Sequence, residues 1–335
     1  MRETNMTLED QDHGPDASEW RFRLEDLSPK LRTAIRGLYK VRPWANAIVL
    51  LYPAAWIVSI AIMQRWPFWP LRAAGVVVIA ISIQAMGTLM HEALHGNLFR
   101  SPFFDRWVGF ALGVPTLFSS AAYKVAHLNH HRYTRSEKDM DEFSYACRTH
   151  RQYVALFYAS FLVGSLLYMC AVPVKAYAMA SHINRRRIVA EYSLMLLIYG
   201  TAVSFAILMR HSEWLLWYWL APISVAVVLA NIRALAEHMG TSGAADALLK
   251  TRTTTSNRLV SFLMLNLNYH LEHHLFPAIP WYNLPRVHRL LKPLYESRGA
   301  VVEKSYTGFV LQCLRRIPEP LHRMPPHDLA VRPSA

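Results

Sequence analysis

Residues 73–95, AAGVVVIAISIQAMGTLMHEALH, join a long apolar run to two histidines that stand four positions apart. The apolar part, residues 73–90, is near the roughly 20 residues that an α-helix needs to span the hydrocarbon core of a bilayer. A helix on the surface of a soluble protein would instead carry an apolar stripe. The stretch therefore predicts a membrane helix that ends in a metal-binding pattern, because neutral imidazole is the commonest metal-binding side chain at physiological pH.

The composition also indicates a multi-pass membrane protein. Hydrophobic residues make up 53% of the 335 residues and charged residues only 18%, which is low for a soluble protein. Four further apolar runs of near-spanning length occur at residues 47–63, 154–172, 192–209 and 214–231. The first 44 residues are polar and mixed in charge, so we expect no cleavable signal peptide.

The net charge of +13 is typical of membrane topology, since basic residues gather on the cytoplasmic side. We expect no nucleic-acid partner, because the chain lacks a basic stripe with interleaved aromatic residues. The three cysteines are widely separated, so neither a disulfide framework nor a Cys-x-x-Cys site is predicted.

Nine of the sixteen histidines lie in three clusters and one outlier beside apolar segments. Residues three or four apart share a face of a helix, so the members of each cluster can bind one ion together. Nine imidazoles are too many for one ion but suit two, divided as five and four. The predicted ligands are His91, His95, His127, His130, His131, His238, His270, His273 and His274.

The ligand type does not select the metal, since all-nitrogen ligation fits iron and also zinc, copper or nickel. The acidic residues near the clusters are either hydrogen-bond acceptors for the second ring nitrogen of a ligating histidine or ordinary solvated charges; they are Asp139, Asp141, Glu237 and Glu272. The remaining histidines lack partners at ligand spacing and are expected at the surface; they are residues 13, 150, 182, 211, 288, 322 and 327.

The topology follows if all nine histidines must lie on the same side of the membrane. Only an even number of crossings can separate residue 131 from His238, so one of the three apolar runs between them does not cross. We predict that residues 154–172, which Pro173 closes and basic residues follow, lie in the interface or re-enter. The shorter stretch 107–118 is predicted to dip into the membrane or to lie along its surface.

The charge distribution agrees with this topology. Of the 36 Lys and Arg residues, only Arg65, Arg72 and Arg210 fall in the predicted outer loops. The predicted fold is thus an all-α membrane protein with four transmembrane helices, interfacial helices, and a cytoplasmic cap that carries the metal site. Its parts are a cytoplasmic N-terminal segment (1–44), a membrane domain (45–290) and a cytoplasmic C-terminal tail (291–335).

The first cluster permits an alternative from another class. His91-Glu92-x-x-His95 matches the zinc-protease motif, in which two histidines bind zinc and the glutamate is the general base. An intramembrane zinc protease would leave the two later clusters unused, and Glu92 is otherwise expected to support a ligand or to face away. A non-enzymatic metal carrier is a third possibility.

At these clusters the chain resembles the integral-membrane fatty acid desaturase/hydroxylase superfamily, the histidine-box non-haem di-iron enzymes. The family pattern is His-x(3–4)-His, then His-x-x-His-His, then His/Gln-x-x-His-His, with a lone histidine after the last membrane helix, here His238. The most specific stretch is residues 268–277, NYHLEHHLFP, and the resemblance spans residues 45–290.

The resemblance implies a di-iron oxidoreductase of lipid metabolism that uses O2 to remove hydrogen from an unactivated C–H bond of an acyl chain. No catalytic residue separate from the ligands is implied. Gln84 and Thr88 would either line the wall of the acyl tunnel or make ordinary hydrogen bonds between helices. Because no His-Pro-Gly-Gly haem motif is present, electrons would come from a separate ferredoxin, cytochrome or reductase. A fatty acid desaturase is the leading interpretation, and a hydroxylase, ketolase or other monooxygenase that acts on another apolar or small molecule is the alternative.

Overall fold

A computed structural model describes residues 22–241 and 246–321. The chain is mostly helical, and five of its described helical segments are long and apolar enough to cross a membrane by length and composition. The main long helices are α2 (Leu51–Arg65), α3 (Trp69–Leu94), α6 (His150–Met179), α7 (His182–Leu208) and α9 (Ala221–His238). The first of the five segments adds the 3-10 turn Pro43–Leu50 to α2, and the last adds α8 (Glu213–Leu215) and the π-turn Leu216–Leu220 to α9.

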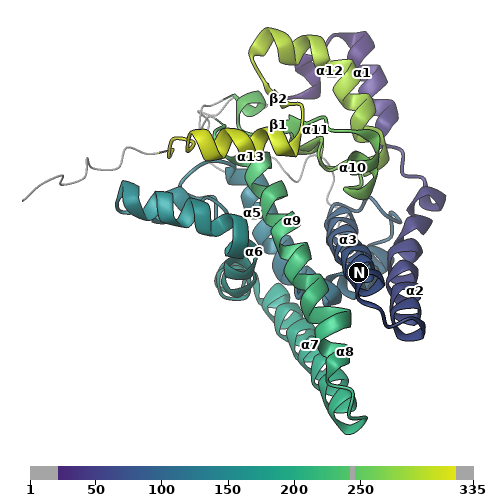
Figure 1. Cartoon of the computed structure of the whole chain (residues 1–335). Helices are drawn as coiled ribbons and strands as arrows, with labels where there is room; N and C mark the ends of the chain where they lie inside the picture. The colour runs from purple at the N-terminus through teal and green to yellow at the C-terminus, as the bar shows by residue number, and fades with distance from the viewer. Residues whose placement is uncertain (1–21, 242–245, 322–335) are drawn as a thin grey trace, which may run out of the picture.

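Helix α3 forms the centre of the apolar core. In its most apolar window 61% of the residues are buried, against 6–28% in the other four segments. Figure 1 shows α2 beside α3, and α7 and α8 together at the far lower end. On α7, Leu196 is 75% exposed and Leu208 is 81% exposed. These exposed leucines are consistent with helices whose solvent is lipid.

The apolar run that was predicted to end at Pro173 differs in the structure. It belongs to the 30-residue helix α6, and Pro173 lies inside it. Proline is tolerated in membrane helices when neighbouring groups satisfy the freed backbone. The structure thus offers five candidate spans where four crossings were predicted, and a surface position for α6 stays a prediction.

The other elements are short and gather at one end of the long helices (Figure 1). They include the strands β1 (Arg252–Thr254) and β2 (Val301–Glu303), a parallel pair that the all-α prediction missed. The helices are α1 (Pro29–Arg36), α4 (Pro102–Gly113), α5 (Ser120–Tyr133), α10 (Arg258–Leu263), α11 (His270–Leu275), α12 (Leu284–Arg298) and α13 (Tyr306–Arg315).

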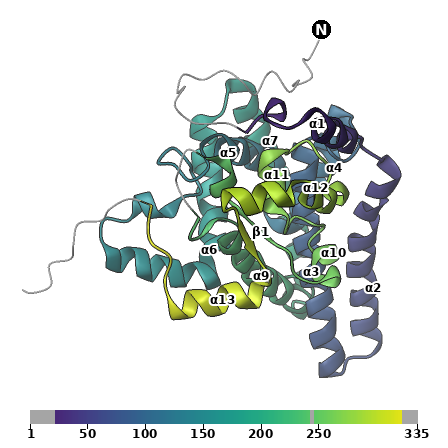
Figure 2. The same ribbon diagram turned by 90° about the horizontal axis from the view of Figure 1, so that it is seen from above.

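Two prolines lie within α12 and do not end it. Pro285 stands in the first turn of α12, where a backbone N–H has no partner within the helix, and Pro293 lies inside the same helix. Viewed from above, α13 lies beside the start of α6 (Figure 2). Phe309 of α13 and Phe157 of α6 are buried in one apolar cluster together with Leu235 of α9, so α13 packs against both α6 and α9.

Candidate metal centre

The structure brings all nine predicted histidines together at the end of the long helices. His91 stands on the last turn of α3, and His95 follows directly after that helix. Helices α5 and α11 carry three histidines each, and His238 is the last residue of α9. The rings separate into the predicted division, a group of five and a group of four.

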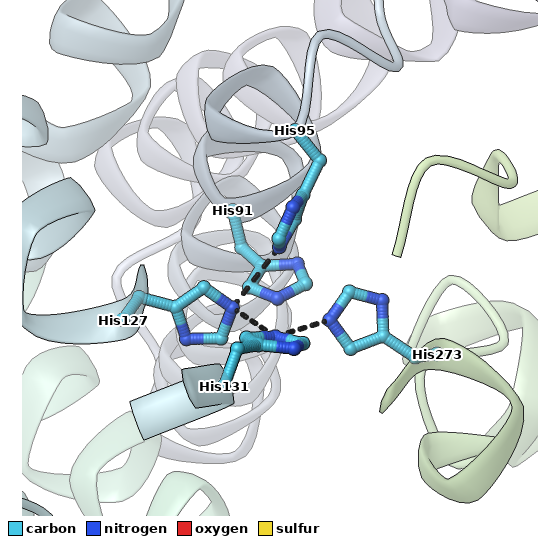
Figure 3. Close-up of side chains that lie close together, drawn as sticks. All are labelled: His91, His95, His127, His131 and His273. Carbon is cyan, nitrogen blue, oxygen red and sulfur yellow. Dashed lines mark hydrogen bonds between the residues drawn. The ribbon is translucent and has the colours of Figure 1, made fainter. Parts of the chain in front are cut away.

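The five-histidine group consists of His91, His95, His127, His131 and His273, whose rings converge on one point (Figure 3). The Nε2 atom of His127 lies 3.1 Å from that of His95 and 2.8 Å from that of His131. The Nε2 atoms of His131 and His273 are 3.1 Å apart. Both ring nitrogens of His91 are buried without a hydrogen-bond partner among the described residues.

The four-histidine group consists of His130, His238, His270 and His274. The Nε2 atom of His238 lies 3.2 Å from that of His130 and 3.0 Å from that of His270. The Nε2 atoms of His270 and His274 are 3.0 Å apart. The same ring nitrogen therefore points inward along both groups.

This arrangement fits one cation for each group. Each ring nitrogen of a neutral imidazole either donates or accepts a hydrogen bond. Several Nε2 atoms that face one point therefore cannot all be satisfied by one another. The ligand atoms of each group lie within 4.8 Å of one another. Two nitrogens on opposite sides of an ion, at about 2.1 Å each, would be about 4.2 Å apart. Nitrogen ligands favour iron, zinc, copper or nickel over calcium and magnesium, which prefer oxygen.

Burial keeps most of these rings neutral, as metal ligation requires. Burial lowers the pKa of His95 to about 3, and it lowers the pKa of His127 and His273 well below the ordinary value. His130 is different. Burial lowers its pKa, but the charge of Asp139 and its contact with the ring outweigh burial and raise the pKa to about 9.

Carboxylates lie near the outward-facing Nδ1 atoms for three of the four acidic candidates, and Asp139 is the one of the three that is hydrogen-bonded to a ring. Asp139 lies 3.0 Å and Asp141 3.6 Å from Nδ1 of His130. Glu237 lies 3.5 Å from Nδ1 of His270. A carboxylate in this position fixes the tautomer and the orientation of a ligating ring.

Glu92 of the protease-like motif is fully buried. It accepts hydrogen bonds from the backbone N–H of Trp281, at 2.9 Å, and from the side chain of Asn97, at 3.3 Å. Its other oxygen lies 3.7 Å from Nδ1 of His91. The carboxylate thus ties α3 to the segment after α11, and the expectation that it supports a ligand fits this position better than a free general base does.

The fourth acidic candidate, Glu272, contacts His288, a residue that was not predicted to belong to the site. Its carboxylate lies 2.6 Å from Nδ1 of His288 on α12 and accepts a hydrogen bond from the hydroxyl of Thr253 on β1. The expectation that His288 is a surface residue was wrong, since its side chain is 12% exposed. The sequence pattern did not indicate this contact, because His288 and Glu272 stand 16 positions apart.

The other histidines that were assigned to the surface fall into two sets. His150, His182 and His211 are exposed, as predicted. The histidines at positions 13, 322 and 327 lie outside the described residues.

A cavity of ≈ 410 Å³ opens beneath the two histidine groups. Members of both groups line it, among them His91 and His270, as do Gln84 and Thr88, which the sequence analysis expected in such a wall. The deeper wall is largely apolar and includes Ile83 of α3 and Ile223 of α9. The volume lies within the range of about 300–1,000 Å³ that is typical of ligand pockets.

Comparison with known proteins identifies the family. Residues 66–306 match the family model described as fatty acid desaturase. The sn-1 oleoyl-lipid 12-desaturase of Arthrospira platensis is 24% identical over 298 residues, which cover 82% of each chain. The human sphingolipid delta(4)-desaturase/C4-monooxygenase DES2 is 27% identical over 284 residues, 78% of this chain and 79% of the relative.

A third relative is the delta(5) fatty acid desaturase fat-4 of Caenorhabditis elegans, which is 23% identical over 278 residues, 70% of this chain and 61% of the relative. The matched family segment contains all nine grouped histidines. The chain therefore belongs to the fatty acid desaturase family and is a membrane oxidoreductase of the desaturase type.

Proposed function

We propose that each histidine group binds one iron ion and that the pair serves the O2-dependent desaturation of a lipid acyl chain. The nine histidines are the proposed ligands. The observation that carries the proposal is the apolar cavity, because rings of both groups form part of its wall. A chain in the cavity would therefore lie against both ions. Bound iron would supply the activation of dioxygen that no protein side chain can provide.

The protein's own groups have two tasks. The first is to hold neutral rings in fixed orientations, for which Asp139 and Glu237 act on His130 and His270. The second is to position the chain, for which the largely apolar wall formed by α3, α6 and α9 would exclude water from the bound acyl chain. The relatives are named as fatty acid and sphingolipid desaturases, which supports a long acyl chain as the substrate.

Electrons would come from a separate ferredoxin, cytochrome or reductase. Lys124 and Arg132 are exposed on α5, the helix that carries His131, and His131 itself is partly exposed. A donor protein that docks at this face would be close to the ions. We place this face and both termini in the cytoplasm, because the basic run 185–187 and most other basic residues lie on the same predicted side.

The test is lipid analysis of a host that expresses the chain. We expect new unsaturated acyl chains that depend on O2, and none with the His274→Ala variant. The His182→Ala variant, which changes an exposed histidine, is the matched control and should give the wild-type products. A lipid profile identical to that of the empty host would contradict the proposal.

Hydroxylation is the second candidate, because the name of one relative combines desaturase and C4-monooxygenase. The same lipid extracts distinguish the two reactions. A desaturated product is lighter than its precursor by two hydrogen atoms, whereas a hydroxylated product is heavier by one oxygen atom.

A further inference from the structure

Arg233 is a cation in the wall of the cavity that the proposed chemistry does not use. It stands on α9 one turn before Glu237, which contacts the four-histidine group. It lines the cavity between the apolar part, formed in part by Ile223 and Ala226, and the histidines above. Ile223 lies about three helical turns below Arg233 along α9.

The guanidinium of Arg233 has few partners. Its Nε and Nη1 atoms are buried and make no hydrogen bond to the described residues. Its contact with charge is a 3.5 Å approach of Nη1 to Glu237, and that same carboxylate oxygen lies 3.5 Å from His270. By contrast Arg135, the other arginine in the wall, bonds to Glu142 and to the backbone oxygen of Thr241.

An arginine with unused donors is costly at this position. Ionisable groups within membrane helices are expensive and mark substrate or ion pathways. The guanidinium presents five donors in a planar fork that suits a carboxylate or another oxygen acceptor. One shared carboxylate leaves most of these donors available to a ligand in the cavity.

We propose that Arg233 binds the acceptor oxygen at the polar end of the acyl substrate, a carboxylate or a carbonyl, and so fixes which carbon is oxidised. The apolar wall below would hold the hydrocarbon tail, so the carbons next to the polar end would lie nearest the histidines. The reacting carbon would then be set by its distance from the polar end. This inference rests on the proposed function, because it requires that the cavity bind an acyl chain for oxidation.

The first test uses the wild-type protein in a host that is fed saturated fatty acids of two odd chain lengths. The double bonds are located by mass spectrometry. We expect the same distance from the acyl carbonyl in both products. A constant distance from the methyl end would overturn the inference, and so would equal conversion of an alkane, which has no acceptor oxygen. Absence of any product would instead contradict the proposed function.

The second test compares Arg233→Met with Arg233→Lys. Arg233→Met removes a hydrogen bond between a charged group and the substrate, so we expect the amount of product to fall about 10- to 100-fold. We also expect the double bond to be distributed over neighbouring carbons. Arg233→Lys keeps a charged donor and should retain the wild-type position at lower yield. Arg186→Met changes an exposed arginine of α7 and is the matched control.

Iron content separates this role from support of the metal site. We expect Arg233→Met to retain wild-type iron. Reduced iron with an unchanged double-bond position would show that Arg233 acts through Glu237 and would overturn the inference. The lipid class that first carries the product distinguishes a free carboxylate from an ester or amide carbonyl. If the Arg233→Met protein fails to accumulate, the double-bond positions in the products of Arg233→Lys and of the wild type still test the inference.

Discussion

The rings of His131 and His274 stack with their centroids 4.2 Å apart and their planes 16° from parallel. His131 belongs to the five-histidine group and His274 to the four-histidine group. The two groups are therefore in direct contact through one ring from α5 and one from α11. The two proposed ion sites are therefore adjacent at this pair of rings.

His274→Ala should remove both a ligand and the stacking partner of His131. We expect activity to fall to the background of the host and the iron content to drop below that of the wild type. Elemental analysis of the purified protein measures the iron, and lipid analysis measures the activity. His182→Ala is the control, and full activity in His274→Ala would refute the ligand assignment.

Asp139→Asn should weaken metal binding by about 10- to 100-fold, which is typical when the acceptor behind a ligating histidine is lost. Asp139 contacts Nδ1 of His130 and also accepts hydrogen bonds from the backbone of Arg135 and Asp141. Asparagine preserves the shape but removes the charge. Competition with an iron chelator measures the change, and Glu137→Gln, an exposed neighbour, serves as the control. Equal retention of iron by Asp139→Asn and the wild type would contradict this role.

Glu272→Ala should lower the thermal stability, because it leaves the hydroxyl of Thr253 and the ring of His288 without their shared partner. Each buried group left unsatisfied costs about 1–3 kcal/mol. Thermal unfolding in detergent is the measurement. Glu296→Ala changes an exposed glutamate on α12 and should leave the midpoint unchanged. An unchanged midpoint in Glu272→Ala would show that this contact does not hold α11 to α12 and β1.

Asn231→Leu should loosen the contact between α9 and α6. The side-chain oxygen of Asn231 accepts hydrogen bonds from the backbone N–H of Ser165, at 2.6 Å, and from its hydroxyl, at 2.5 Å. Its amide donates to the carbonyl of Phe161 at 3.2 Å. Hydrogen bonds between membrane helices contribute about 0.6 kcal/mol on average, so a loss of about 1–2 kcal/mol is expected for the set. The measurement is thermal unfolding in detergent, and the control is Ser224→Ala, which removes a hydrogen bond within a single helical segment. Equal unfolding midpoints for the two variants would argue against a stabilising contact between α9 and α6 at Asn231.

Local spacing explains what the sequence alone could predict. Histidines three and four positions apart share a helix face, so the clusters themselves follow from short-range geometry. The membership of the two groups does not, because His130 joins His270 and His274 whereas His127 and His131 join His273. The expectation that the members of each cluster bind one ion together was therefore wrong for the clusters on α5 and α11. The partner of Glu272 could not be predicted, because His288 approaches it only through the tertiary contact of α11 with α12. The pairing of β1 with β2 joins residues that are far apart in the chain, and each strand is too short to show an alternating pattern.

The same limit explains the difference at α6. Proline ends most helices, so Pro173 predicted a boundary there. Whether a neighbouring helix compensates for a proline depends on contacts that are distant in sequence, such as the packing of Val172 and Ala176 against Ala122 of α5. The cavity residues Gln84 and Thr88 were predictable because they stand about two turns and one turn before His91 on the same helix.

The metal content of the purified full-length protein tests the central claim most directly. We predict about two iron ions per chain, with zinc well below that level, together with O2- and reductant-dependent formation of an unsaturated lipid. One zinc ion per chain together with peptide cleavage would contradict the account and favour the protease reading of His91 and His95.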